Sequence, residues 1–130
     1  MILTVTLSTA AAMAVLSAWM MMRTGSLRGK LQIKHGDGGN AQLLQRMRAQ
    51  LNFVETAPFI LALIALIELA GKGGMWLPYV AGLYIIARVA HVLGMDSDDV
   101  TKPRMFGVLI TMLSLVGLAV VAVLIQLRIL

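Results

Sequence analysis

The chain has 130 residues, of which 59% are hydrophobic and 13% are charged. Soluble domains average about 45–50% apolar and 25% charged residues, so this composition excludes an ordinary soluble domain and indicates an integral membrane protein. The absence of cysteine excludes disulfides, thiolate metal sites and a thiol nucleophile of the chain's own, and the net charge of +5 suits Lys and Arg at a membrane surface better than nucleic-acid binding.

Four apolar segments are long enough to cross a bilayer, which requires about 20 mostly apolar residues. They are residues 1–22, 49–70, 75–95 and 105–127. The first segment has no basic residues ahead of its apolar run, so we interpret it as a retained span and not as a secretory signal. We therefore predict a single all-α domain over residues 1–130, an integral membrane four-helix bundle.

Basic residues are concentrated in two connections that lie on the same side of a four-span protein. Segment 23–48 and segment 96–104 hold most of the Lys and Arg, whereas the opposite side has only Lys72 and Arg128. The positive-inside rule places loops rich in Lys and Arg in the cytoplasm. We expect both segments to be cytoplasmic and both termini to be periplasmic.

The first connection ends in "HGDGGN", residues 35–40. Its glycines predict a turn before the second helix, and Asn40 is suited to cap that helix. The segment is not a phosphate-binding loop, because it lacks the GxxxxGK[ST] spacing and follows no strand. We expect the second helix to run from about Ala41 to Ala70.

Polar residues enter the cytoplasmic end of the second span. Arg48, Asn52 and Glu55 are spaced i, i+4 and i+7, so they share one face of a helix. At 1.5 Å per residue, Asn52 lies about 6 Å and Glu55 about 10 Å inward from Arg48. Pro58 frees the carbonyl of Val54 and loosens the helix beside Glu55.

The third span, which runs in the opposite direction, brings Arg88 and His91 to matching depths. Charged residues at membrane depth face a protein interior or an aqueous cavity and find partners there. We predict two pairs, Glu55 with Arg88 and Asn52 with His91. These pairs could simply join the helices. However, Arg48, Arg88 and Arg104 surround one carboxylate, and this excess of cations favours a site for an anionic ligand.

These residues resemble a known family. The run "RAQLNFVE" at 48–55 with Pro58, and "ARVAH" at 87–91 with a basic residue opening the fourth helix, are similar to the MAPEG family, the membrane-associated proteins in eicosanoid and glutathione metabolism. The resemblance covers essentially the whole chain, and "HGDGGN" resembles the bacterial branch. It implies a homotrimer in the bacterial inner membrane, with glutathione sites between subunits near the cytoplasmic side.

The resemblance also implies roles for individual residues. Arg48, Asn52 and Glu55 match the residues of the second helix that hold glutathione, and Arg88 and His91 match polar positions of the third. Arg104 matches an arginine beside the sulfur and is the candidate catalytic residue, because cations stabilise a thiolate. Arg28 corresponds loosely to an arginine that reaches the neighbouring subunit's site. The second substrate is expected to be lipophilic and to arrive from the bilayer.

The chain departs from the family's pattern at three positions near the expected thiol. Met95 stands where several catalytically competent relatives have tyrosine, Leu51 where another has arginine, and Met105 where serine would follow the arginine. A non-catalytic binding or scaffold protein is therefore the alternative to a transferase or peroxidase. A small multidrug transporter is disfavoured because the first span holds no carboxylate. Conjugation, peroxide reduction and isomerisation all remain open, as does the use of a thiol other than glutathione.

Overall fold

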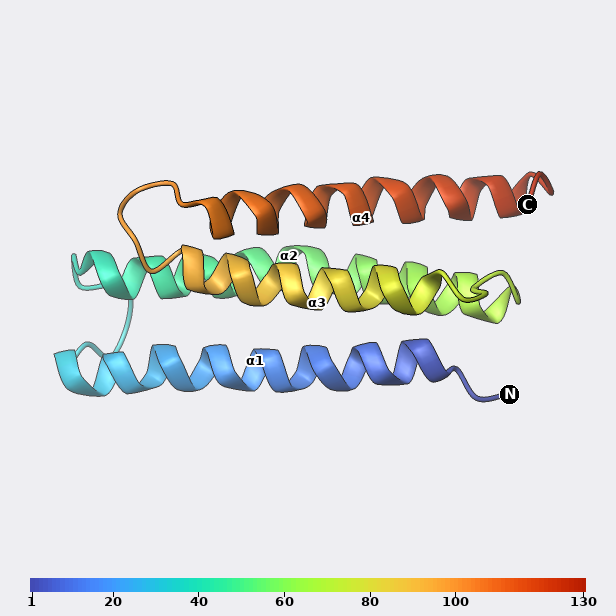
Figure 1. The fold of residues 1–130 in the computed structure, drawn as a ribbon. Helices are drawn as coiled ribbons and strands as arrows, with labels where there is room; N and C mark the ends of the chain where they lie inside the picture. The colour runs from blue at the N-terminus through green and yellow to red at the C-terminus, as the bar shows by residue number, and fades with distance from the viewer.

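A computed structural model describes all residues from 1 to 130. It contains four helices and no strands (Figure 1): α1 (Thr4–Leu31), α2 (Ala41–Leu69), α3 (Leu77–Gly94) and α4 (Lys102–Gln126). All four are long and apolar enough to cross a membrane. The expected all-α four-helix membrane bundle is confirmed.

The helices lie side by side and alternate in direction (Figure 1). Both termini lie at one end of the bundle, and the α1–α2 and α3–α4 connections lie at the other, which we call the basic end. α3 packs against both α1 and α4, whereas α1 and α4 do not contact each other. The bundle is therefore layered, with α2 and α3 in the middle.

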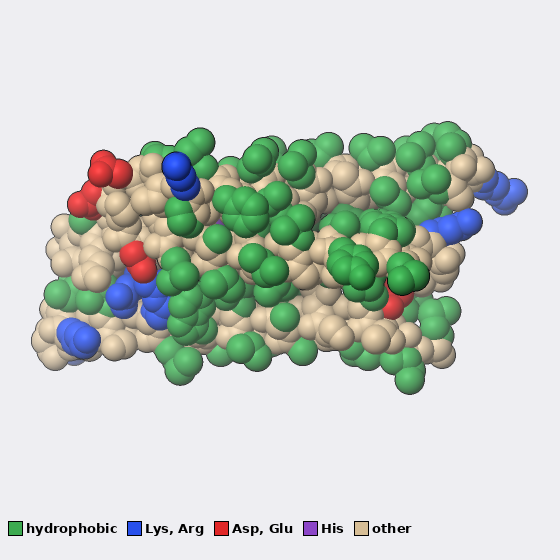
Figure 2. Space-filling view, in the orientation of Figure 1, with side chains coloured by type: hydrophobic (Ala, Val, Ile, Leu, Met, Phe, Trp, Pro, Cys, Tyr) green, Lys and Arg blue, Asp and Glu red, His purple; other side chains and the backbone are tan.

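The core follows one stripe of α2. Residues at every third or fourth position are buried, as expected for a helix with one apolar face toward its neighbours: Phe53, Ala57, Ile60, Ile64 and Ile67. On the face shown in Figure 2, hydrophobic side chains cover the middle, while charged side chains gather toward the two ends. This distribution suits a chain whose middle faces lipid.

α1 is longer than its apolar segment. The sequence placed a connection from residue 23, but the helix continues to Leu31, and only residues 32–40 are non-helical. Arg23, Arg28 and Lys30 favour this extension, whereas Gly25 and Gly29 oppose it, so helix propensity alone does not explain it. Thr24 and Leu27 are buried, and this packing against the bundle supports the last turns of the helix. It stops at Gln32, whose φ of 58° is left-handed. The 28 residues of α1 span about 42 Å, more than the roughly 30 Å of a bilayer core.

α2 begins as the sequence predicts. The side chain of Asn40 accepts a hydrogen bond from the backbone N–H of Leu43 at 2.9 Å. Gly36, Gly38 and Gly39 before it have positive φ, which explains why glycine is favoured in this turn. α2 then continues without interruption through Pro58.

At the end opposite the basic end, Glu68 of α2 caps α1. Its carboxylate accepts hydrogen bonds from the backbone N–H groups of Val5 at 2.9 Å and Thr6 at 2.8 Å, and from the Thr6 hydroxyl at 2.7 Å. The first turn of a helix has N–H groups without intrahelical partners, and a carboxylate there also complements the helix dipole. Glu68 thus fixes the start of α1 against the end of α2.

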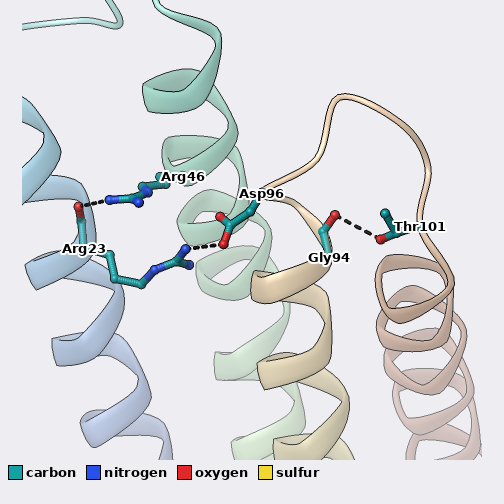
Figure 3. A network of polar contacts seen from close by, with 5 residues as sticks. All are labelled: Arg23, Arg46, Gly94, Asp96 and Thr101. Carbon is teal, nitrogen blue, oxygen red and sulfur yellow. Dashed lines mark hydrogen bonds and ion pairs between the residues drawn. The ribbon is translucent and has the colours of Figure 1, made fainter.

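Polar contacts join three elements at the basic end (Figure 3). Arg23 of α1 forms an ion pair with Asp96, which follows α3, and Arg46 of α2 donates to the backbone carbonyl of Arg23 at 2.7 Å. Gln45 also donates to Asp98 at 2.6 Å. The acidic segment after α3 is therefore held against α1 and α2.

Candidate functional site

A polar cavity of about 190 Å³ opens near the basic end between α2, α3 and α4. Its walls combine two arginines, one carboxylate, one amide and one imidazole with three apolar side chains. We call it the polar cavity, and its lining residues are Arg48, Leu51, Asn52, Glu55, His91, Met95, Arg104 and Val108. No group of three or more His, Cys, Asp or Glu in the chain is arranged to hold a metal ion.

α2 supplies one wall through its helical repeat. Arg48, Asn52 and Glu55 lie on the same face and all line the polar cavity, as their spacing predicted. Arg48 and Glu55 are exposed in the single chain, whereas Asn52 is half-buried. Two oppositely charged groups are thus available to a ligand at this wall, with an amide between them.

The opposite wall depends on the close approach of α3 and α4. A Cβ atom on Gly107 would overlap the Cβ of His91 and the carbonyl oxygen of Ala87, and one on Gly94 would overlap the backbone nitrogen of Arg104. Only glycine permits the two backbones to lie this close. Because of this contact, Arg104 of α4 and His91 of α3 border the same cavity.

Thr101 stabilises the start of α4 at that contact. Its hydroxyl donates to the carbonyl of Gly94 at 3.0 Å (Figure 3) and accepts from the backbone N–H of Arg104 at 3.4 Å. Thr101 therefore caps α4 and ties it to the end of α3, which fixes the backbone position of Arg104.

The predicted ion pair between Glu55 and Arg88 is wrong. Arg88 is fully buried and donates to the Thr111 hydroxyl at 3.2 Å and to Nδ1 of His91 at 3.3 Å, whereas Glu55 is exposed at the polar cavity. The sole salt bridge of the chain joins Arg23 and Asp96. Glu55 and Arg88 were expected at the same depth in the membrane, but their side chains do not point toward each other. The Arg88 side chain turns toward α4 and not toward α2.

The predicted pair of Asn52 and His91 is not formed either. No hydrogen bond joins them, although both side chains line the polar cavity. The Nδ1 atom of His91 is engaged by Arg88, and the side-chain amide of Asn52 makes no hydrogen bond within the chain. The two side chains are thus both placed beside a ligand space and not against each other.

Arg28 lies apart from the other expected site residues. It donates to the carbonyl of Gly36 at 2.7 Å and to the sulfur of Met47 at 3.4 Å. It borders a separate open groove of about 520 Å³ between α1 and α2, which we call the α1 groove. Leu51 lines both this groove and the polar cavity, so the two hollows lie on either side of one α2 residue.

Comparison with known proteins decides the family. The sequence model of the MAPEG family matches residues 6–124, nearly the whole four-helix region. The chain belongs to the MAPEG family. It is an integral membrane protein of a family associated with eicosanoid and glutathione metabolism.

Individual relatives are bacterial. Inner membrane protein YecN of Escherichia coli K12 is 31% identical over 86 residues, which are 62% of this MAPEG chain and 65% of YecN. YecN of Escherichia coli O6:H1, strain CFT073, matches to the same extent. The chain thus spans slightly less than two thirds of the length of the curated relatives it matches. No solved structure matches the chain.

Two features of the site went unrecognised in the sequence. Thr111 reads as an ordinary residue of an apolar span, and only the structure reveals its contact with Arg88. Gly107 likewise lies in an uncharged apolar span, and only the structure reveals that it lies against His91. The spacing of 104, 107 and 111 along one face of α4 was the available signal.

Proposed function

We propose that the protein is a glutathione-dependent transferase or peroxidase of the bacterial inner membrane that acts on lipophilic electrophiles. One observation carries the proposal: Arg48, Asn52, Glu55, His91 and Arg104 line a single cavity. The cavity belongs to a protein of the MAPEG family, and its polar groups are complementary to those of glutathione.

The charges of the polar cavity suit this ligand. Two arginines and one glutamate give the lining a net charge of about +1, and glutathione, with two carboxylates and one ammonium, carries about −1. In this proposal, Arg48 would bind a carboxylate and Glu55 would bind the ammonium. Asn52, between them, would supply directional hydrogen bonds.

Arg104 is the proposed catalytic residue. Since the chain has no cysteine, the reactive sulfur has to come from the ligand. A free thiol has a pKa of about 8.5, and a nearby cation lowers this pKa by stabilising the thiolate. In conjugation, the thiolate sulfur would form a bond to an electrophilic carbon while the leaving group departs with its electron pair. Arg104 would hold the negative charge on the sulfur until that bond forms.

The site is proposed to lie between subunits of a homotrimer. Ligand pockets usually measure about 300–1,000 Å³, so a cavity of about 190 Å³ in one chain does not enclose a tripeptide. A neighbouring chain would complete it. Arg28, which lines the α1 groove on the other side of Leu51, would serve the site of a neighbour and not its own.

We also propose an orientation in which the basic end faces the cytoplasm. Most Lys and Arg lie in segments 23–48 and 96–104, and the positive-inside rule assigns such segments to the cytoplasm. The relatives named YecN are inner membrane proteins, which supports the same membrane here. Glutathione would then enter from the cytoplasm and the lipophilic substrate from the bilayer.

A non-catalytic binding protein is the second candidate. Leu51 and Met95 line the polar cavity, and the family resemblance implies arginine and tyrosine at these positions in catalytically competent relatives. Neither an aliphatic side chain nor a thioether donates a hydrogen bond to a thiolate. This observation favours binding without turnover.

The two candidates differ in one experiment on the purified protein in detergent. Glutathione binding would be measured by calorimetry, and conjugation by the absorbance change of an aryl halide. We expect Arg48→Gln and Glu55→Gln to abolish binding. Arg128→Gln, which changes an exposed arginine after α4 at the opposite end of the bundle, should leave binding intact. Binding with turnover supports the enzyme, and binding alone supports the second candidate. Absence of binding to the native chain refutes both.

A further inference from the structure

Arg88 is a buried cation that has no carboxylate partner. Its side chain is fully buried, and its Nε atom has no hydrogen-bond partner. Its two remaining nitrogens are engaged, one by the Thr111 hydroxyl of α4 and the other by Nδ1 of His91. A buried charge is costly unless it is hydrogen-bonded, so these two contacts define where the guanidinium lies.

The contact with Arg88 decides which nitrogen of His91 carries the proton. A guanidinium has five N–H donors and no acceptor. In the 3.3 Å contact between Arg88 Nη2 and His91 Nδ1, Arg88 is therefore the donor and Nδ1 the acceptor. An acceptor nitrogen carries no proton, so the imidazole is neutral and holds its proton on Nε2.

His91 lines the polar cavity, although only 3% of its surface is exposed. With Nδ1 engaged in the interior, Nε2–H is the remaining polar group of the ring. It is a donor, and the other lining groups at this wall are the Arg104 guanidinium and two apolar side chains, Met95 and Val108. On the α2 wall, the Asn52 amide oxygen and the Glu55 carboxylate could accept a hydrogen bond, but neither is hydrogen-bonded to His91. Nε2–H is therefore free to donate to an acceptor that a ligand brings into the cavity.

Thr111 determines the direction of the Arg88 guanidinium. The hydroxyl of Thr111 is buried with 3% of the residue exposed, and it accepts from Arg88 Nη1 at 3.2 Å. Gly107, one turn earlier on α4, lets this part of the helix lie against His91 and Ala87. Loss of the hydroxyl would leave a second nitrogen of Arg88 without a partner and free the guanidinium to turn away from His91.

We propose that Thr111 and Arg88 are positioning residues that hold His91 as its neutral Nε2–H tautomer, and that His91 thereby presents a hydrogen-bond donor to an anionic group, a carboxylate or a thiolate, in the polar cavity. The identity of that anion as part of glutathione rests on the proposed function. The tautomer does not, because it follows from contacts within the chain.

Nuclear magnetic resonance of the full chain in detergent, with ¹⁵N-labelled histidine and no ligand, tests the first part. The chain has two histidines, and a His35→Gln variant assigns the signals of His91. We expect an unprotonated Nδ1 and a protonated Nε2 in the native chain. A proton on Nδ1, an even mixture of tautomers or an imidazolium would overturn the proposal.

Variants of α4 test the positioning role. We expect Thr111→Val to mix the tautomers and to weaken glutathione binding about three- to tenfold, the factor that one hydrogen bond supplies. Thr111→Ser keeps the hydroxyl and should restore both properties. Ser114→Ala removes another buried hydroxyl of α4 that does not contact Arg88, and should change neither.

The remaining outcomes are equally decisive. A native tautomer pattern in Thr111→Val would overturn the role of Thr111. If Thr111→Val does not fold, Arg88→Lys replaces it, because an ammonium does not span both partners of the guanidinium, and the same mixing of tautomers is expected. If the native chain has the expected tautomer but binds no glutathione, the proposed function fails while the positioning of His91 stands.

Discussion

Substitution of Gly107 by alanine is predicted to separate α3 from α4 at the polar cavity. The added Cβ would overlap the Cβ of His91 and the carbonyl oxygen of Ala87, and neither group belongs to the flexible end of a side chain. Overpacking of this kind costs about 1–3 kcal/mol, and contact with rigid groups places it at about 2–3 kcal/mol. Alanine regains about 1 kcal/mol through its higher helix propensity. We expect a net loss of about 1–2 kcal/mol, which is roughly a 5- to 30-fold change in the ratio of folded to unfolded protein.

The matched control is Gly117→Ala in the same helix. A Cβ there meets no atom within 4 Å, so only the gain in helix propensity applies, and stability should rise by up to about 1 kcal/mol. The free energy of unfolding would be measured in mixed micelles by titration with a denaturing detergent, with glutathione binding measured on the same samples. Equal stability of the two variants would refute the close contact of α3 and α4 on which the position of Arg104 depends.

Three further predictions concern the ends of the bundle and the proposed chemistry. Glu68→Ala should lower the free energy of unfolding by about 0.5–2 kcal/mol, because it removes the acceptor for the first N–H groups of α1; Glu68→Gln, which keeps one acceptor oxygen, should lose less. Arg104→Gln should leave the glutathione affinity within a fewfold of that of the native chain. It should raise the pKa of the bound thiol by about one, as measured from the ultraviolet absorbance of the thiolate. An unchanged pKa would show that Arg104 does not stabilise the thiolate. The cysteine-free chain also permits a direct test of orientation, in which a membrane-impermeant maleimide should label Lys72→Cys in intact cells and His35→Cys only after the cells are opened. The reverse pattern would invert the proposed topology.

The position of residues along each helix could be predicted from the sequence, because helical periodicity is local. Arg48, Asn52 and Glu55 share a wall of the polar cavity as their spacing required, and Asn40 caps α2 as its residue type indicated. Helical periodicity and helix capping depend only on residues that are close in the chain, so a single sequence is enough to predict them.

The direction in which a buried side chain turns could not be predicted in the same way. Arg88 lies at the expected depth, yet it turns toward Thr111 because α4 approaches α3 at Gly107, and that approach is a property of the packed bundle. The hydrogen bond between Glu68 and the Thr6 N–H at the start of α1 joins residues 62 positions apart, and no local sequence pattern predicts it. The extension of α1 to Leu31 could not be predicted from hydropathy, because the end of an apolar segment indicates the end of the membrane span and not the end of the helix.

The unequal lengths of the helices give the basic end a stepped outline. α1 and α2, at about 42 and 44 Å, outreach α3, at about 27 Å, and in Figure 1 they extend past the start of α4. The polar cavity therefore lies beside the part of α2 that extends past the end of α3. Under the proposed function and orientation, a water-soluble thiol would reach such a step from the cytoplasm and a lipophilic partner from the bilayer, so neither would have to leave its own solvent before they meet.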